Sequence, residues 1–206
     1  MNQALIYCAA AIAGYLIGNI QFAVIFSHIL HHDDVRHHGS GNAGSTNMLR
    51  VYGIKAGVVT FIGDLIKGAG AVLLGRAMGG QEAAYCAALG VVIGHCWPVF
   101  FRFKGGKGKG VASSLGAAVL LNPLWGLIAG VAGIVVVLIT RTISPASLTG
   151  FTVYVIIALF FGNTMWDKIA AVLLFAIVVY RHRENIVRLI QGKESAVFSK
   201  ADKQTK

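Results

Sequence analysis

Charge is scarce in this sequence. Charged residues make up 13% of its 206 residues, whereas an ordinary soluble domain carries roughly 25%. Hydrophobic residues make up 56%. This combination argues against a soluble protein and predicts one compact all-α integral membrane domain. We assign that domain to residues 1–191 and expect 192–206 to form a polar cytoplasmic tail.

Cysteine is scarce as well. Cys8, Cys86 and Cys96 all lie in apolar stretches, and none belongs to a C-x-x-C pair. This pattern argues against a disulfide framework and against a zinc site. The chain also lacks a basic segment before its first apolar run, and that run is longer than the roughly 7–15 residues of a signal-peptide core. We therefore expect a retained transmembrane helix there.

Acidic residues are few: 8 Asp and Glu stand against 18 Lys and Arg, for a net charge of +10. Such an excess can indicate a nucleic-acid partner. Here, however, the basic residues lie between apolar runs and not on one face, so we interpret them as signals of membrane topology. We expect no nucleic acid as a partner.

Apolar stretches long enough to span a bilayer dominate the remaining sequence, although some are short for the roughly 17–25 residues that a span needs. We expect seven transmembrane helices, at 4–28, 55–77, 83–102, 111–121, 124–140, 148–162 and 168–182. An odd number of crossings puts the two ends of the chain on opposite sides. The short stretches are expected to thin the bilayer or to be broken.

The basic residues test this topology. Fifteen of the 18 fall in the segments that would share one side, which are 29–55, 102–110, 141–147 and 181–206. The other side holds Arg76 and Lys168, and Lys67 lies within a span. The positive-inside rule makes the rich side cytoplasmic, with the N-terminus outside and the C-terminus in the cytoplasm.

The first polar segment on that side is 36–50, which contains Gly39-Ser40-Gly41-Asn42-Ala43-Gly44. The glycines match G-x-G-x-x-G, but no strand precedes them, so a dinucleotide fold is excluded. Glycines allow backbone N–H groups to converge on an anion. Ser45, Thr46 and Asn47 are candidate caps of a following helix, and Arg50 is a planar phosphate donor. The alternative is a flexible loop with a helix cap.

The second segment, 94–114, alternates lysine with glycine at 104–110 and resembles a phosphate cradle, although the order of a Walker A loop fails. An anchor at the membrane surface would need the charge but not the glycines. His95 is a candidate for either a core hydrogen bond or a site role.

The third segment is 181–195. His182 and Asn185 are three residues apart and share a helical face. Histidines at 31–38 lack partners beyond Asp33 and Asp34, which argues against a metal site. We expect Asp64 and Lys67, at i and i+3 within a span, to form a structural salt bridge.

Taken together, these motifs closely resemble the acyl-phosphate-dependent glycerol-3-phosphate acyltransferases of bacteria, the PlsY family. The resemblance covers nearly the whole chain and rests on Gly39–Asn42 through Leu49-Arg50, on Gly94-His95 through Phe103–Gly108, and on Arg181-His182 through Arg188-Leu189. An extra Lys-Gly precedes Val111-Ala112, so the family's second-motif lysine is either Lys107 or Lys109.

The resemblance implies that acyl phosphate and glycerol 3-phosphate react at the cytoplasmic face of the bacterial inner membrane. The products are 1-acyl-glycerol 3-phosphate (lysophosphatidic acid) and phosphate, in the first acylation of phospholipid synthesis. It implies no cofactor, no metal, no coenzyme A or acyl-carrier thioester and no obligatory protein partner.

We assign catalytic roles to Ser40, Asn42, Thr46, His182 and Asn185. Substrate-binding roles go to Gly41, Gly44, Asn47, Arg50, Lys104, Gly106, Lys107, Gly108, Lys109 and Ser147. Backbone N–H groups at Gly41 and Asn42 are expected to hold the acyl phosphate or the oxyanion.

Two questions stay open at this level. The proton acceptor is either His182 or a substrate phosphate, and we favour the phosphate. The competing function is a transporter of small organophosphate anions, which would share the charge, glycines and helices. A transporter should carry its polar residues near the midplane, often in repeated halves. Here they gather at one face and no repeat is visible.

Overall fold

The computed structural model describes residues 2–101 and 108–196, and within these ranges the chain forms helices and no strands. The helices are α1 (Gln3–Gly18), α2 (Phe22–His31), α3 (Ser45–Tyr52), α4 (Ile54–Cys96), α5 (Val111–Leu121), α6 (Pro123–Thr140), α7 (Ile143–Phe161), α8 (Met165–Arg181) and α9 (Arg183–Ile190). Two short 3₁₀ turns, η1 (Val35–His37) and η2 (Val99–Phe101), lie between them. The all-α class is therefore confirmed for the described part of the chain.

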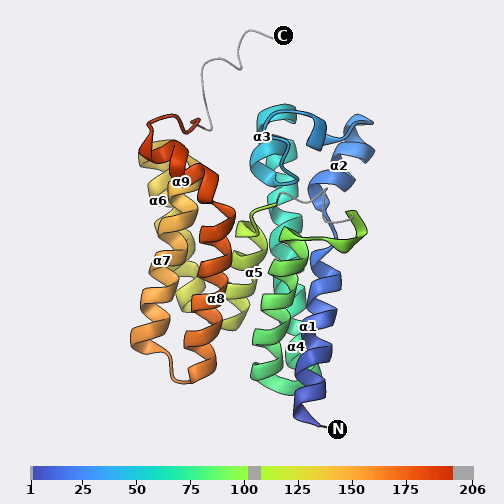
Figure 1. Cartoon of the computed structure of the whole chain (residues 1–206), viewed down its shortest axis with the longest axis vertical. Coiled ribbons are helices and arrows are strands. Elements are labelled where there is room, and N and C mark those ends of the chain that lie inside the picture. The colour runs from blue at the N-terminus through green and yellow to red at the C-terminus, as the bar shows by residue number, and fades with distance from the viewer. Residues whose placement is uncertain (1, 102–107, 197–206) are drawn as a thin grey trace.

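The long helices pack side by side as a bundle, and α2, α3 and α9 lie together at its upper end (Figure 1). Four helical stretches are long and apolar enough to cross a membrane: Gln3–His31, Ile54–Phe101, Pro123–Thr140 and Ile143–Phe161. The second of these is more than one crossing long. It reverses direction at Gly79 and Gly80, whose backbone is not helical, with φ at +77° for Gly80.

The first expected span, 4–28, is not one continuous helix. The chain leaves the helix after Gly18, and α2 begins only at Phe22. Asn19 and Gln21 lie in this break, and both are buried. Their side chains donate to backbone carbonyls near the break: Asn19 Nδ2 donates to Tyr15 O at 2.7 Å, and Gln21 Nε2 donates to His95 O, in the last turn of α4, at 3.2 Å.

Glycine allows α1 to approach the second half of α4 closely. A Cβ atom on Gly14 would lie 2.2 Å from Ala87 O, and one on Gly94 would lie 2.1 Å from Tyr15 O. Small residues at such contacts allow dispersion contacts and close packing to replace the hydrophobic effect, which is weak between helices in lipid. This packing fixes the end of α4 that carries His95.

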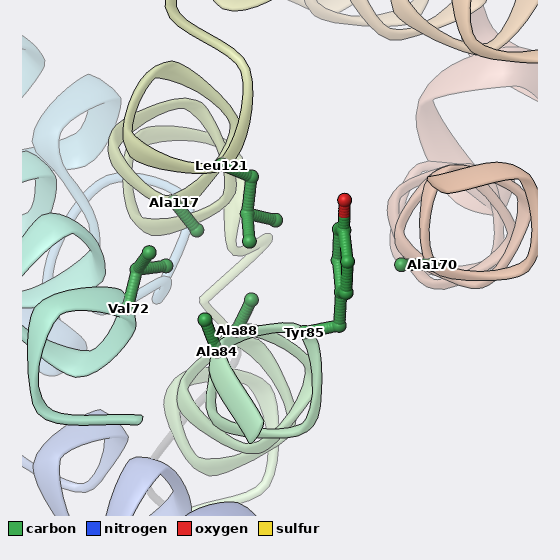
Figure 2. Packing of buried hydrophobic residues seen from close by; sticks show 7 residues of the cluster. All are labelled: Val72, Ala84, Tyr85, Ala88, Ala117, Leu121 and Ala170. Carbon is green, nitrogen blue, oxygen red and sulfur yellow. The ribbon is translucent and has the colours of Figure 1, made fainter. Parts of the chain in front are cut away.

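A small hydrophobic core joins the two halves of α4 to α5 and α8 (Figure 2). The ring of Tyr85 stands between Leu121 of α5 and Ala170 of α8, while Val72, Ala84 and Ala88 fill the space beside it. The Tyr85 hydroxyl donates to Asp167, which also caps the start of α8 in a capping box with Thr164. These contacts pack α5 against both α4 and α8.

Candidate active site

A cavity of about 750 Å³ opens among α3, α4, α5, α6, α7 and the α8–α9 junction. Most of the expected site residues line it: Ser40, Asn42, Gly44, Thr46, Asn47, Arg50, Gly108, Lys109, Ser147, His182 and Asn185. Lys104, Gly106 and Lys107 lie outside the described residues. Three segments that are far apart in the sequence therefore converge on one site, as the sequence predicts.

The cavity has a polar part and an apolar part. Its polar lining comes from the loop at 40–47, from Lys109 and from α9, whereas its apolar lining comes from the facing sides of α5, α6 and α7. Gly130 and Gly133 contribute no side chain to that apolar wall. Ile134 and Leu138 line the cavity and are also 61% and 73% exposed, so the apolar part opens at the side of the bundle.

Asn47 organises the first loop from the first turn of α3. Its Oδ1 accepts from Ser40 N at 2.9 Å, and its Nδ2 donates to the carbonyl oxygens of Val35 and His38, both at 3.0 Å. Gly39 packs on it with φ at +57°, and a Cβ there would lie 2.4 Å from Asn47 Oδ1. The Asn47 amide is therefore fully engaged with the loop backbone, although the residue borders the cavity.

Two expectations for this loop are wrong. Gly41 N donates to His38 O at 2.9 Å, so this N–H is already used and Gly41 does not line the cavity. This bond closes the tight turn 38–41, in which the first central residue, Gly39, has φ at +57°. In addition, Ser45, Thr46 and Asn47 do not cap α3: the N-cap is Gly44, which has no side-chain cap. The first N–H groups of α3 consequently border the cavity without a side-chain cap.

Glu194 joins the site from beyond α9, within the segment that we expected to be tail. Its Oε1 accepts from Ser144 Oγ at 2.6 Å and from Asn185 Nδ2 at 2.5 Å, and its Oε2 accepts from Arg188 Nε at 2.7 Å. Asn185 Nδ2 also donates to Ser144 Oγ at 2.8 Å. The amide oxygen is thus the remaining polar atom of Asn185.

Glu194 was not among the expected site residues because it lies two residues after Gly192 in a polar stretch, where a solvated chain is the ordinary outcome. The only signal was an acidic residue among many basic ones. Burial raises the pKa of Glu194, but the hydrogen bonds from Ser144, Asn185 and Arg188 outweigh it and hold that pKa below its ordinary value.

Arg181 was also missed as a site residue. Its Nε donates to Gly108 O at 3.0 Å, and its guanidinium lies 5.3 Å from the centre of the Trp97 ring. Arg181 thereby connects the end of α8 to the residues that precede α5.

Lys109 follows Gly108 and is largely shielded from solvent. This desolvation lowers the pKa of Lys109 to about 8. Glu194 opposes this shift, while Arg188, Arg50 and Arg181 add to it.

The tautomer of His182 follows from its contacts. Its Nδ1 lies 2.7 Å from Val178 O. A carbonyl only accepts, so Nδ1 carries the proton and Nε2 is bare in the neutral ring. Desolvation, followed by the charge of Lys109, lowers the pKa of His182 to about 4. The ring is therefore neutral at pH 7 and offers an acceptor, not a cation, to the cavity that it lines.

Comparisons with known proteins identify the family of this chain. Residues 8–192 match the family model described as glycerol-3-phosphate acyltransferase. The chain belongs to the glycerol-3-phosphate acyltransferase family. It is an acyltransferase of phospholipid synthesis and an integral membrane protein.

Curated relatives support the assignment. The glycerol-3-phosphate acyltransferase of Thermoanaerobacter sp. (strain X514) is 42% identical over 93% of this chain and 96% of its own. That of Neisseria meningitidis serogroup C (strain 053442) is 43% identical over 92% and 96%.

Two solved structures resemble this acyltransferase. The crystal structure of PlsY (YgiH) in its glycerol 3-phosphate form has a TM-score of 0.87 and 34% identity, covering 97% of this chain and 99% of that one. The lysophosphatidic acid form has a TM-score of 0.83 and 33% identity, covering 92% and 94%.

Proposed function

We propose that this acyltransferase transfers a fatty acyl group from acyl phosphate to the 1-hydroxyl of glycerol 3-phosphate, at the cytoplasmic face of the bacterial inner membrane. The observation that carries the proposal is the two-part cavity. A cationic polar part suits two phosphate groups, and the apolar part between α5, α6 and α7, open at the side of the bundle, suits one acyl chain. The glycerol 3-phosphate and lysophosphatidic acid forms of PlsY are consistent with that acceptor and product.

The reaction needs little from the protein beyond placement. The glycerol hydroxyl attacks the acyl carbonyl carbon, the new ester bond forms, and the bond from that carbon to the phosphate oxygen breaks. Acyl phosphate is already activated, so proximity, worth roughly 7–11 kcal/mol, is the main contribution. Arg50 and Lys109 hold the phosphates, and Asn42, Ser40 and Thr46 lie on the acyl-phosphate side.

The remaining residues position the acceptor. The unprotonated Nε2 of His182 and the amide oxygen of Asn185 accept hydrogen bonds from glycerol hydroxyls. Ser147, which lines the cavity from α7, completes the acyl-phosphate side with Thr46. Asn47 contributes indirectly, because its hydrogen bonds to Ser40, Val35 and His38 fix the backbone of the first loop. The leaving proton goes to a substrate phosphate, because a phosphate monoester with a pKa near 6 is a stronger base than His182 with a pKa of about 4.

The donor test uses purified protein in detergent with palmitoyl phosphate and glycerol 3-phosphate, and detects lysophosphatidic acid. We expect product with acyl phosphate alone, without metal or partner protein. Palmitoyl-coenzyme A at the same concentration is expected to give none. Turnover with the thioester but not with acyl phosphate would reject this donor while leaving the acyltransferase assignment intact.

The topology gives a second prediction. We propose seven crossings, with the two limbs of α4 counted separately at Gly79-Gly80 and with α5 as a short span. A cysteine introduced at position 194 should then be labelled by a membrane-impermeant reagent only from the cytoplasm, and one at 78 or 164 only from outside. Labelling of 78 and 194 from the same side would contradict the seven-span arrangement.

The pKa of Lys109 gives a third prediction. An anion is held by the charged ammonium, and that charge is lost as the pH rises through about 8. We expect kcat/KM for glycerol 3-phosphate to fall above that pH, since kcat/KM reports groups of the free enzyme. Lys109→Arg stays charged and should remove this alkaline limb. An unchanged limb in the variant would assign the titration to another group.

His182 gives a fourth prediction. His182→Gln keeps a group of similar reach but removes the ring base. If a substrate phosphate takes the proton, KM for glycerol 3-phosphate should rise with kcat largely retained at saturation. General-base catalysis contributes about 10²–10⁴-fold. A loss of kcat on that scale, with KM unchanged, would identify His182 as the base.

A further inference from the structure

A cluster of three titratable side chains is buried where the break after α1 meets both limbs of α4. Asp64, Lys67 and His95 are each 5% exposed or less. Lys67 Nζ lies 2.8 Å from Asp64 Oδ1, which confirms the expected salt bridge, and it donates to Ile20 O at 2.6 Å. It also lies 2.8 Å from His95 Nδ1. The mechanism described above uses none of these three groups.

The contacts of Lys67 determine the tautomer of His95. A carboxylate, the carbonyls of Gly18 and Ile20 and the imidazole nitrogen surround its ammonium, and each of them can only accept because an ammonium only donates. His95 Nδ1 therefore carries no proton. The neutral ring must carry its proton on Nε2, at the opposite side.

That second nitrogen lies against a residue of the cavity wall. His95 and Asp64 both line the cavity, beside Gly108 and Lys109. A Cβ atom on Gly108 would lie 2.3 Å from His95 Nε2, so the ring lies directly against the glycine that precedes Lys109. Among the described residues, no side chain or carbonyl accepts a hydrogen bond from Nε2. A donor at the cavity wall without a protein acceptor leaves a hydrogen bond unmade, and an anionic oxygen in the cavity would accept it.

We propose that His95 donates its Nε2–H to a substrate phosphate oxygen, and that Lys67 and Asp64 are positioning residues that fix the ring and its tautomer. This proposal rests on the proposed function, because it assumes that phosphate groups occupy the polar part of the cavity. His95 supplies a neutral donor beside the charged donor Lys109.

Two substitutions at position 95 separate this role from a structural one. The side-chain amide of asparagine lies about as far from the backbone as Nδ1 of histidine does. His95→Asn therefore keeps an acceptor for Lys67 but removes the donor to the cavity. The side-chain amide of glutamine lies about as far from the backbone as Nε2 of histidine does. His95→Gln therefore keeps the donor to the cavity and weakens the contact with Lys67. We expect KM to rise about 10- to 100-fold in His95→Asn and much less in His95→Gln. The opposite order would show that the contact with Lys67 is what matters and would overturn the proposal.

The two substrates are distinguished by measuring KM for acyl phosphate and for glycerol 3-phosphate separately in both variants. The substrate whose KM rises in His95→Asn is the one that the ring binds. An unchanged KM for both would reject the contact.

A measurement on the unmodified protein does not depend on turnover. Nitrogen NMR of ¹⁵N-histidine-labelled protein, with the His95 signals assigned by comparison with His95→Gln, should show protonation at Nε2 and none at Nδ1 between about pH 6 and 8. Glycerol 3-phosphate or inorganic phosphate should shift the Nε2 signal. Protonation at Nδ1, or no shift at saturating ligand, would contradict the proposal. A shift in a protein that shows no turnover with acyl phosphate would instead reject the donor and keep the His95 contact.

Discussion

Lys67→Met is expected to destabilise the protein by about 3–5 kcal/mol, which is the usual result of leaving one member of a buried ion pair without its partner. The substitution leaves Asp64 buried beside an uncharged side chain, and it also strips the Ile20 carbonyl of its donor. For a chain of this size the midpoint of thermal unfolding in detergent should fall by roughly 10 °C or more.

Two comparisons control this experiment. Lys55→Met makes the same change at an exposed position in the first turn of the same helix, and it should leave the midpoint within about 2 °C. Adding Asp64→Leu to Lys67→Met removes the uncompensated carboxylate and should recover part of the loss. Recovery should be incomplete, because the carbonyls in the break after α1 still lack their donor. A Lys67→Met protein as stable as the wild type would mean that the pair is dispensable.

The second large effect is expected at Glu194. Glu194→Gln removes the negative charge and replaces one acceptor oxygen with an NH2 group, so either Arg188 or the pair Ser144 and Asn185 loses its acceptor. We expect kcat/KM to fall roughly 10- to 100-fold, since each lost hydrogen bond to a charged group is worth about 1.5–3 kcal/mol. Glu184→Gln, on the same helical turn as Asn185 but exposed, should have little effect.

The pH profile provides a separate measurement of this network. Glu194 raises the pKa of Lys109, so its loss should move the alkaline limb to a pH below about 8. The contribution of the Glu194 carboxylate to stability also depends on pH in the acid range. Because folding lowers the pKa of Glu194, its contribution to stability is complete above its ordinary pKa and is lost as the pH falls through the folded value. An unchanged kcat/KM and an unmoved limb in Glu194→Gln would together contradict the positioning role.

The sequence predicted the helical class and the convergence of three polar segments, because both depend on local patterns. Apolar runs report burial in lipid, and glycine-rich polar segments cannot be buried there. It did not predict the break after Gly18, since the run at 4–28 stays apolar on average. Asn19 and Gln21 were the available signal for that break, but the hydrogen bond that explains Gln21 goes to the carbonyl of His95, far away in the sequence.

Roles that depend on tertiary contacts could not be predicted either. Gly41 and Asn47 were expected to bind substrate because of their residue types, but hydrogen bonds within the loop engage the N–H of one and the amide of the other. Conversely, Arg181 gains its role through Gly108, and Glu194 gains part of its role through Ser144, both distant in the sequence. Hydrogen bonds of this kind join segments whose proximity no local periodicity reports.

The lateral opening beside Ile134 and Leu138 has a kinetic consequence for the proposed reaction. A donor that enters from the bilayer is encountered at its mole fraction among lipids and not at its bulk molarity, whereas glycerol 3-phosphate arrives from water. In vesicles of fixed protein content, adding inert phospholipid should slow the reaction at constant total acyl phosphate, while the dependence on glycerol 3-phosphate keeps its ordinary three-dimensional form. The lysophosphatidic acid would be released directly into the leaflet, so product inhibition should also scale with surface density.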